Sequence, residues 1–393
     1  MGKIFSVYAS QGPHNYVELD LPASDYEMLD LKERLRLEPG QLPYVEILKF
    51  HEEYDYLEKC IQELPDIFQL NALAKKMSEF SSVQDKAAFE GLVGKEIAKG
   101  AVPVELPQLI DIAHSTDCCH VVEDVATDYE LGRFLAENGF VLEAEDLSDA
   151  AFELLDFNKI GREPRETEGS VFTSLGYVEQ YMEVHHVSET MDFQPQKPEY
   201  TTLLNMMPLP FVKKTDPEDK VLLPLPASEE QMRDALEKMG VNDWNDVAAS
   251  IWDCALPQLV HEIYLDGEVP QIAEFAQCLS TLDARDELPQ YKALLTAMEC
   301  RDIGQAIALA GTVDEYIFNP KASSPEDVAM SELRVMIDRS QADSFAQYVN
   351  LQAFGLSLLE RDHAVITSYG LIERQDGQPI QAMEQKPEGM VMM

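Results

Sequence analysis

The chain has 393 residues, of which 72 are acidic and 30 are basic, so its formal net charge is −42. This charge excludes nucleic acid as a partner, because phosphate binding needs a basic surface, and it favours a basic protein instead. Positions 1–180 hold 36 acidic and 15 basic residues, and positions 181–393 hold the same numbers, so each half carries −21. Hydrophobic residues make up 45% of the chain, which indicates folded domains rather than a disordered acidic tail.

The sequence repeats itself at a spacing of about 200 residues. Leu-Pro-Ala-Ser at residues 21–24 recurs at residues 225–228, an offset of 204. A later matched set, offset by 194, places Gly161 opposite Gly355. Offsets of this length predict two whole domains rather than a solenoid of short repeats. We expect a first unit at 1–180, a linker at 181–197, a second unit at 198–376 and a flexible tail at 377–393.

Each unit is predicted to begin with two short strands and a helix. The strands are expected at residues 4–9 and 17–21, and at 201–206 and 221–225. Ser24 with Glu27, and Ser228 with Gln231, have the spacing of a capping box, which closes the first turn of a helix. Behind these caps, apolar residues recur at helical spacing: Met28, Leu31 and Leu35, and Met232, Ala235 and Met239.

Two further helices are predicted in the middle of each unit. The first carries a proline in its opening turn, Pro65 in one unit and Pro270 in the other. Its buried faces are expected at Ile67, Leu70, Leu73 and Met77, and at Ile272, Phe275, Cys278 and Leu282. The second begins at Thr127 and stops at 138–139, and its counterpart begins at Ser324.

Each unit is predicted to end with a short helix, a glycine turn and a hairpin. The helices are expected at residues 151–157 and 345–351, followed by turns at Gly161 and Gly355. The hairpins carry Thr-Ser-x-Gly, which ends at Gly176 in one unit and at Gly370 in the other. The fold class is therefore α+β, with small subdomains of short antiparallel strands and helices, and with more helix than sheet.

The densest acidic stretches are the candidates for binding a basic partner. In the first unit they are Glu123, Asp124, Asp128, Glu130, Glu143, Glu145, Asp146, Asp149, Glu153 and Asp156. Their counterparts in the second unit are Asp314, Glu315, Glu326, Asp327, Glu332, Asp338 and Asp343. An acidic run is often only a solvated face, so a salt-adapted protein whose charge serves solubility remains an alternative.

No residue pattern predicts a metal, a cofactor or a catalytic centre. His114, Cys118, Cys119 and His120 lie close in sequence, but adjacent cysteines do not readily bind one tetrahedral zinc ion, so no metal is expected. The histidine pair at 185–186 is interpreted as polar linker. The motifs of serine hydrolases, P-loop proteins, dinucleotide-binding enzymes and zinc proteases are absent from the sequence, so we expect a protein that is not an enzyme.

The cellular compartment is inferred from the cysteines and from apolar runs. The six cysteines form no CxxC pair and no disulfide framework. The first residues lack the apolar core of a signal peptide, and no stretch of 18 apolar residues occurs. We therefore expect a cytoplasmic protein without disulfides and without membrane contact.

Several stretches resemble one protein family in their residues, order and spacing. They are 109–119 (LIDIAHSTDCC), 128–135 (DYELGRFL), 155–161 (LDFNKIG), 169–178 (GSVFTSLGYV), 348–355 (YVNLQAFG), and Leu70-Asn71 with Leu73. On these residues the chain resembles the ArdA antirestriction family, with Leu351 where the family has a second tyrosine. The resemblance covers most of 1–180 and, more loosely, 198–376.

The resemblance implies an elongated DNA mimic with three small subdomains in each unit. It implies that the acids above stand in for phosphates in the DNA-binding groove of a type I restriction-modification enzyme, or of another DNA-targeting defence enzyme. It also implies carriage on plasmids or conjugative elements. Family members are one unit long and pair as dimers, so we expect this chain to be a monomeric pseudo-dimer. The alternative is an acidic, non-catalytic scaffold or chaperone that binds a basic partner.

Overall fold

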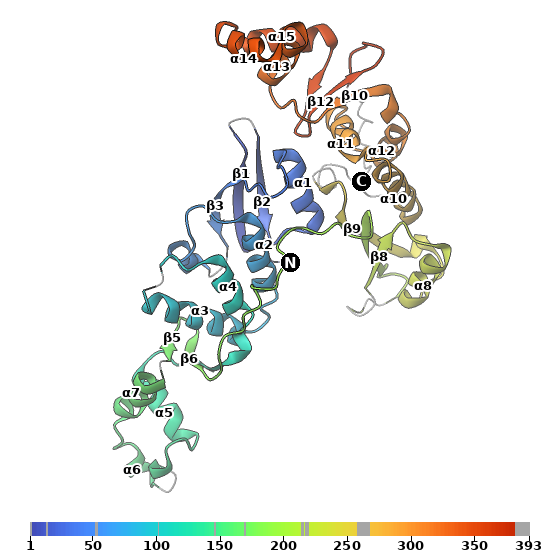
Figure 1. The fold of residues 1–393 in the computed structure, drawn as a ribbon. Coiled ribbons are helices and arrows are strands. Elements are labelled where there is room, and N and C mark those ends of the chain that lie inside the picture. The colour runs from blue at the N-terminus through green and yellow to red at the C-terminus, as the bar shows by residue number, and fades with distance from the viewer. Residues whose placement is uncertain are drawn as a thin grey trace, which may run out of the picture. The chain divides into compact units, whose positions relative to one another are not determined.

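The computed structural model describes residues 2–12, 15–51, 54–100, 102–144, 147–168, 170–213, 216, 220–257 and 268–381. This part of the chain is mixed α+β, as the sequence predicts, with fourteen α-helices and four three-stranded sheets (Figure 1). No helix in these ranges is long and apolar enough to cross a membrane.

The elements of the first half alternate short strands with helices. They are β1 (Phe5–Ser10), β2 (Tyr16–Leu21), α1 (Asp25–Leu35), β3 (Tyr44–Phe50), η1 (Asp55–Lys59), α2 (Ile67–Met77), α3 (Val83–Ala98), α4 (Leu106–Ala113), η2 (Thr116–Cys118), β4 (Cys119–Glu123), α5 (Asp128–Glu137), η3 (Leu142–Ala144), α6 (Asp149–Phe152), α7 (Phe157–Glu168), β5 (Val171–Phe172) and β6 (Gly176–Gln180). The label η marks a 3-10 helix.

The second half runs through a closely similar succession. Its elements are β7 (Thr202–Pro208), β8 (Val221–Leu225), α8 (Glu229–Met239), η5 (Trp244–Asp246), β9 (Val247–Cys254), α10 (Val269–Asp283), α11 (Leu288–Ala297), α12 (Ile303–Ala310), η6 (Val313–Glu315), β10 (Tyr316–Asn319), α13 (Pro325–Met336), α14 (Arg339–Phe345), η7 (Ala346–Tyr348), α15 (Leu351–Asp362), β11 (Val365–Ile366) and β12 (Leu371–Arg374).

The sheets have matching strand orders in the two halves. The first sheet of each half has its first strand in the centre, in the orders β2-β1-β3 and β8-β7-β9. The second has its last strand in the centre, in the orders β4-β6-β5 and β10-β12-β11. In these central strands Val178 pairs with Val121 and Val171, and Ile372 pairs with Phe318 and Val365, all antiparallel. Val178 and Ile372 are both fully buried, because a helix packs on each strand, α3 on β6 and α11 on β12.

The contacts of the chain define two compact units. Unit 1 comprises residues 1–9, 18–23 and 42–194, and unit 2 comprises residues 10–17, 24–41 and 195–393. The boundary between residues 194 and 195 falls in the stretch that the sequence marks as linker. Helix α1 belongs to unit 2, although it precedes most of unit 1 in the sequence. Sequence reasoning did not foresee this placement.

The core of unit 2 is one apolar cluster. It joins Met206 of β7, Met239 of α8, Phe275 of α10 and Leu294 of α11, all at most 1% exposed. Tyr26 of α1 belongs to the same cluster, and its hydroxyl donates to the carbonyl of Tyr200. Burying this much apolar surface is the main stabilising term for a unit whose acids repel one another.

A buried ion pair joins α1 to the rest of unit 2. The Lys292 ammonium lies 2.8 Å from Asp30 Oδ1 and 2.6 Å from Glu33 Oε2, and the Tyr369 hydroxyl donates to Asp30 at 3.1 Å. Burial lowers the pKa of Lys292, but Asp30 and Glu33 together outweigh burial and raise that pKa. The lysine therefore stays charged inside the unit.

The predicted capping boxes are confirmed. Ser24 accepts from the Glu27 backbone N–H at 3.1 Å, and its own N–H donates to the Glu27 carboxylate at 2.7 Å. Ser228 and Gln231 make the same pair of bonds, at 3.2 and 2.8 Å. Both helices end at a residue in left-handed conformation, which is Arg36 in α1 and Gly240 in α8. The predicted starts at Thr127 and Ser324 are confirmed as N-caps as well.

The prediction for the first turn of α2 is wrong by one position. Asp66 is the N-cap and accepts from the Phe68 and Gln69 N–H groups, so Pro65 lies just outside the helix. Pro270 lies in the first turn of α10, as predicted. The predicted faces of both helices are buried, except that Cys278 is only partly buried.

The prediction of short helices near the end of each half is also wrong. Residues 151–157 span the end of α6 and the beginning of α7, and residues 345–351 separate α14 from α15. The long helices α7 and α15 contain Gly161 and Gly355, so these glycines do not form turns. Gly176 and Gly370 do have the positive φ that the sequence predicts, 153° and 147°.

Gly161 and Gly355 are needed because two helices approach closely there. A Cβ on Gly161 would lie 1.9 Å from the carbonyl oxygen of Asp128 in α5, and a Cβ on Gly132 would lie 1.9 Å from that of Phe157 in α7. A Cβ on Gly355 would lie 1.8 Å from the carbonyl oxygen of Pro325 in α13. Helix α5 therefore packs backbone to backbone on α7, and α13 on α15.

Candidate functional site

The candidate acids of the first half gather around α5, α6 and α7. Figure 1 shows these three helices together next to the hairpin of β5 and β6. The candidate acids exposed there are Glu123 at the end of β4, Asp124 after it, Glu130 in α5, Asp149 in α6, Glu153 at its end and Asp156 before α7. Glu143 lies in η3, and Glu145 and Asp146 lie outside the described residues.

Two of these acids hold the local fold. The Asp128 carboxylate pairs with Arg165 at 2.7 Å and with Arg162 at 3.5 Å, which ties the start of α5 to α7. The hydrogen bond from Arg165 lowers the pKa of Asp128. Glu130 accepts from the Ala126 N–H and the Thr127 hydroxyl, both at 2.9 Å, and these bonds lower its pKa. Both groups therefore stay ionised, but the Asp128 carboxylate and Oε2 of Glu130 already accept bonds within the fold.

The acids of the second half divide in the same way. Asp327 accepts from the Ser323 N–H at 2.9 Å and from its hydroxyl at 2.7 Å, and Asp338 caps α14 through the Ser340 N–H at 3.0 Å. The remaining partners are arginines, Arg361 for Glu332 at 3.6 Å and Arg334 for Asp343 at 2.9 Å. Glu326 lies half-buried in the first turn of α13, and Asp314 and Glu315 lie exposed in η6.

The acids of the two halves do not all occupy matching positions. Asp314 and Glu315 precede β10, so their counterparts in the first half are Asp117 and Cys118 of η2, which precede β4. Glu123 is the last residue of β4 and Asp124 follows it, and neither has an acidic counterpart at the end of β10.

Only some of the candidate acids therefore present a carboxylate that a partner protein can contact. In the described residues, Glu123, Asp124, Asp149 and Asp314 are exposed and make no side-chain hydrogen bond or ion pair. Chemically, such carboxylates can accept hydrogen bonds and ion pairs from lysine and arginine. In the second half, Glu326 is also without such a bond but is only partly exposed.

Sequence reasoning missed an apolar hollow beside these acids. It has a volume of about 1040 Å³ and is lined by Phe134, Phe140 and Leu142 together with Ile160 and Tyr177. Phe140 and Leu142 are 68% and 76% exposed, which is unusual for such large apolar side chains. The cap and stop signals that predicted α5 give no sign of the hollow, because Phe140 and Leu142 follow the end of that helix.

The residues weighed as a metal cluster in the sequence do not come together as a group. His120 stacks on Tyr181, with ring centroids 4.2 Å apart. Burial raises the pKa of the Cys119 thiol to about 12 and lowers that of His114. The fold instead places His185, from the predicted linker, beside Asp117 and Cys118.

Comparison with protein-family models, with curated proteins and with solved structures finds no match to this chain.

Proposed function

We propose that the chain is an ArdA-like DNA mimic that occupies the DNA-binding groove of a type I restriction-modification enzyme or a related DNA-targeting defence enzyme. The observation that carries the proposal is the set of exposed carboxylates around α5, α6 and α7, in a chain of net charge −42. The family in this proposal rests on the motif resemblance, and the mechanism rests on the charge. The protein acts by occupation and not by catalysis, in the cytoplasm of a host that carries a mobile element.

The magnitude of the charge supports mimicry. B-DNA carries two charges per base pair, so −42 corresponds to roughly 21 base pairs. A lysine- and arginine-lined groove would release counterions on binding this protein, as it does on binding DNA. No base-specific contact is required, because phosphate contacts supply non-specific affinity.

The repeated order of elements and of strands supports two tandem ArdA-like units in one chain. In this proposal the units are residues 1–180 and 198–376, and the chain is a monomeric pseudo-dimer of two units. Light scattering should then report a mass near 44.3 kDa at physiological salt. A stable species of twice that mass at sub-micromolar concentration would count against the pseudo-dimer.

The test compares two variants with the same change in charge. One replaces Glu123, Asp124, Asp149 and Asp156 by their amides; the control replaces Glu46, Glu58, Glu63 and Glu105, which are equally exposed but lie on other elements. Inhibition of a type I restriction enzyme is measured against competing DNA over a range of salt concentrations. Amides retain the shape of each side chain, so folding is little affected.

We expect competition with DNA and a steep loss of affinity with salt. The first variant should bind more weakly than the control, with a salt slope lower by up to about one per neutralised carboxylate. An equal loss of affinity in both variants would mean that the net charge of the protein, and not the position of these carboxylates, determines binding. Binding of a basic protein without competition by DNA would favour the scaffold or chaperone alternative.

A further inference from the structure

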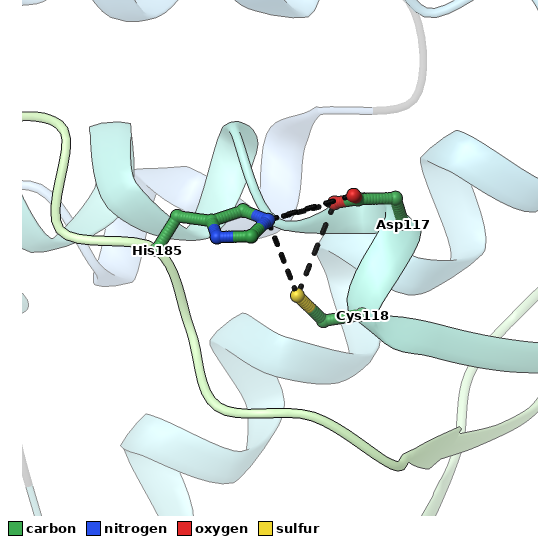
Figure 2. Close-up of side chains that lie close together, drawn as sticks. All are labelled: Asp117, Cys118 and His185. Atoms are coloured by element: carbon green, nitrogen blue, oxygen red, sulfur yellow. Dashed lines mark hydrogen bonds and ion pairs between the residues drawn. The ribbon is translucent and has the colours of Figure 1, made fainter.

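Three potential metal ligands from two distant parts of unit 1 meet at η2. Figure 2 shows His185 turned toward Asp117 and Cys118. Its Nε2 lies 3.6 Å from Cys118 Sγ and 3.3 Å from Asp117 Oδ1, and Cys118 Sγ lies 3.9 Å from that same oxygen. His185 is 67 residues from Cys118 in the sequence, so only the fold brings them together.

These separations are close to the edges of a tetrahedral zinc site. Zinc bonds of about 2.3 Å to sulfur and about 2.1 Å to nitrogen and oxygen give edges of roughly 3.6 Å from sulfur to nitrogen or oxygen and roughly 3.4 Å from nitrogen to oxygen. The sulfur–nitrogen and nitrogen–oxygen distances match these edges to about 0.1 Å, and the sulfur–oxygen distance is longer than its ideal by about 0.3 Å.

The segment that carries His185 is fastened to unit 1. The His185 N–H donates to Ser115 Oγ at 2.8 Å, and the Tyr181 hydroxyl donates to the carbonyl of Asp117 at 2.7 Å. The N–H and hydroxyl of Ser188 donate to the Asp111 carboxylate at 2.7 and 2.9 Å. These hydrogen bonds fix the backbone on both sides of the imidazole, so His185 has a defined position beside η2.

Without a cation, the same side chains make an ordinary hydrogen-bonded group. The Cys118 thiol donates to the carbonyl of Glu183 at 3.3 Å, and burial raises the pKa of that thiol. Such a network satisfies the polar atoms but does not require a sulfur at this position. A thiolate, an imidazole and a carboxylate converging on one point are a donor set for Zn²⁺, whereas Ca²⁺ and Mg²⁺ take oxygen ligands.

We propose that Asp117 Oδ1, Cys118 Sγ and His185 Nε2 bind one Zn²⁺ ion, with water or the Glu183 carbonyl as the fourth ligand. The ion fastens the segment at 181–188 to η2, where the chain leaves the first half. Binding releases the thiol proton to solvent, so the thiolate is the ligand. The site belongs to the first half alone, because Glu315 takes the place of Cys118 in η6.

The test titrates the full-length, reduced, chelator-stripped protein with Co²⁺. We expect one Co²⁺ per chain with the thiolate charge-transfer band and strong visible bands of tetrahedral cobalt, bleached by Zn²⁺. Cys118→Ser should abolish the charge-transfer band. His185→Ala should weaken Co²⁺ binding by more than about tenfold, because losing even a residue that only supports a metal ligand typically weakens binding by about tenfold or more. The matched controls, Cys119→Ser and His186→Ala, should bind as the wild type does.

A second measurement needs no substitution of the buried Cys118. Zn²⁺ should raise the thermal midpoint of the wild type and of His186→Ala, but not that of His185→Ala, because only a ligand that binds the folded state stabilises it. The 72 acids can bind cobalt weakly through carboxylates, which gives the pale spectrum of octahedral Co²⁺. That spectrum alone, or thiolate bands unchanged in His185→Ala, would overturn the proposal.

Discussion

Lys292 lies with its side chain 4% exposed against the carboxylates of Asp30 and Glu33. Replacing it by methionine would leave the buried Asp30 carboxylate without its counter-charge, which typically costs about 3–5 kcal/mol. We therefore expect Lys292→Met to lower the free energy of unfolding by this amount in denaturant titration. Lys197→Met, which breaks the exposed pair with Asp283, should cost about 0–1 kcal/mol.

The pH dependence of stability in wild type and Lys292→Met distinguishes the contribution of the ion pair from that of side-chain packing. The pKa of Lys292 is raised in the folded protein, so its contribution is fully present below the unfolded value of about 10.4 and is lost as pH rises through the folded pKa. The stability difference between wild type and Lys292→Met should therefore shrink at alkaline pH. A difference that stays constant to the highest measurable pH would mean that the methylenes, not the charge, stabilise the unit.

At the scale of elements, the close packing of α5 on α7 requires a glycine, Gly161, at the contact. Gly161→Ala would press a methyl group against the Asp128 carbonyl oxygen, and overpacking of this kind costs about 1–3 kcal/mol or more. Gly94→Ala is the matched control, because Gly94 is also helical but a Cβ there meets nothing within 4 Å. That variant should be stabilised by roughly 0.5–1 kcal/mol. Thermal denaturation of both variants measures the contrast; a stabilised Gly161→Ala would contradict the close crossing.

The same crossing shows which elements the sequence could predict. Ser24, Thr127, Ser228 and Ser324 were recognised as caps because a cap is made within one turn of chain. Gly161 was misread, because a glycine in a tight helix crossing and a glycine in a turn look the same in one sequence. The distinction depends on a neighbouring helix that the pattern does not place.

The candidate site was predictable to a similar extent. Composition identified the acidic stretches, but not that Asp128, Glu130 and Asp327 hold their own helices through ion pairs and caps. Nor could spacing show that His185 returns to Cys118, because that contact is set by backbone hydrogen bonds such as the one from His185 to Ser115. Long-range contacts depend on the whole fold, whereas caps do not.

At the scale of the whole molecule, the net charge of −42 opposes folding. Salt screens this repulsion, with a Debye length that falls from about 30 Å at 0.01 M to about 8 Å at 0.15 M. We expect the thermal midpoint to rise with KCl over this range, measured with a chelator present so that metal ions do not contribute. A midpoint that falls with salt would mean that the surface ion pairs outweigh the repulsion.

The two-unit organisation is tested by limited proteolysis. We expect cleavage first between residues 189 and 200, because this stretch is mostly exposed and contains no helix or strand. The preceding segment at 181–188 is held by the backbone N–H groups of His185 and Ser188. The two fragments should stay together on gel filtration, because the N-terminal fragment contains α1, and α1 belongs to unit 2. Cuts within α2, or fragments that separate without denaturant, would contradict this organisation.

The placement of α1 in unit 2 has a consequence for the order of events on the ribosome. Asp30 is synthesised 262 residues before Lys292 and 339 residues before Tyr369. At about 5–20 residues per second, Asp30 is made roughly 13–52 s before Lys292. During that interval the Asp30 carboxylate has neither Lys292 nor Tyr369 to pair with, so the packing of α1 in unit 2 is completed only when the last third of the chain has been made.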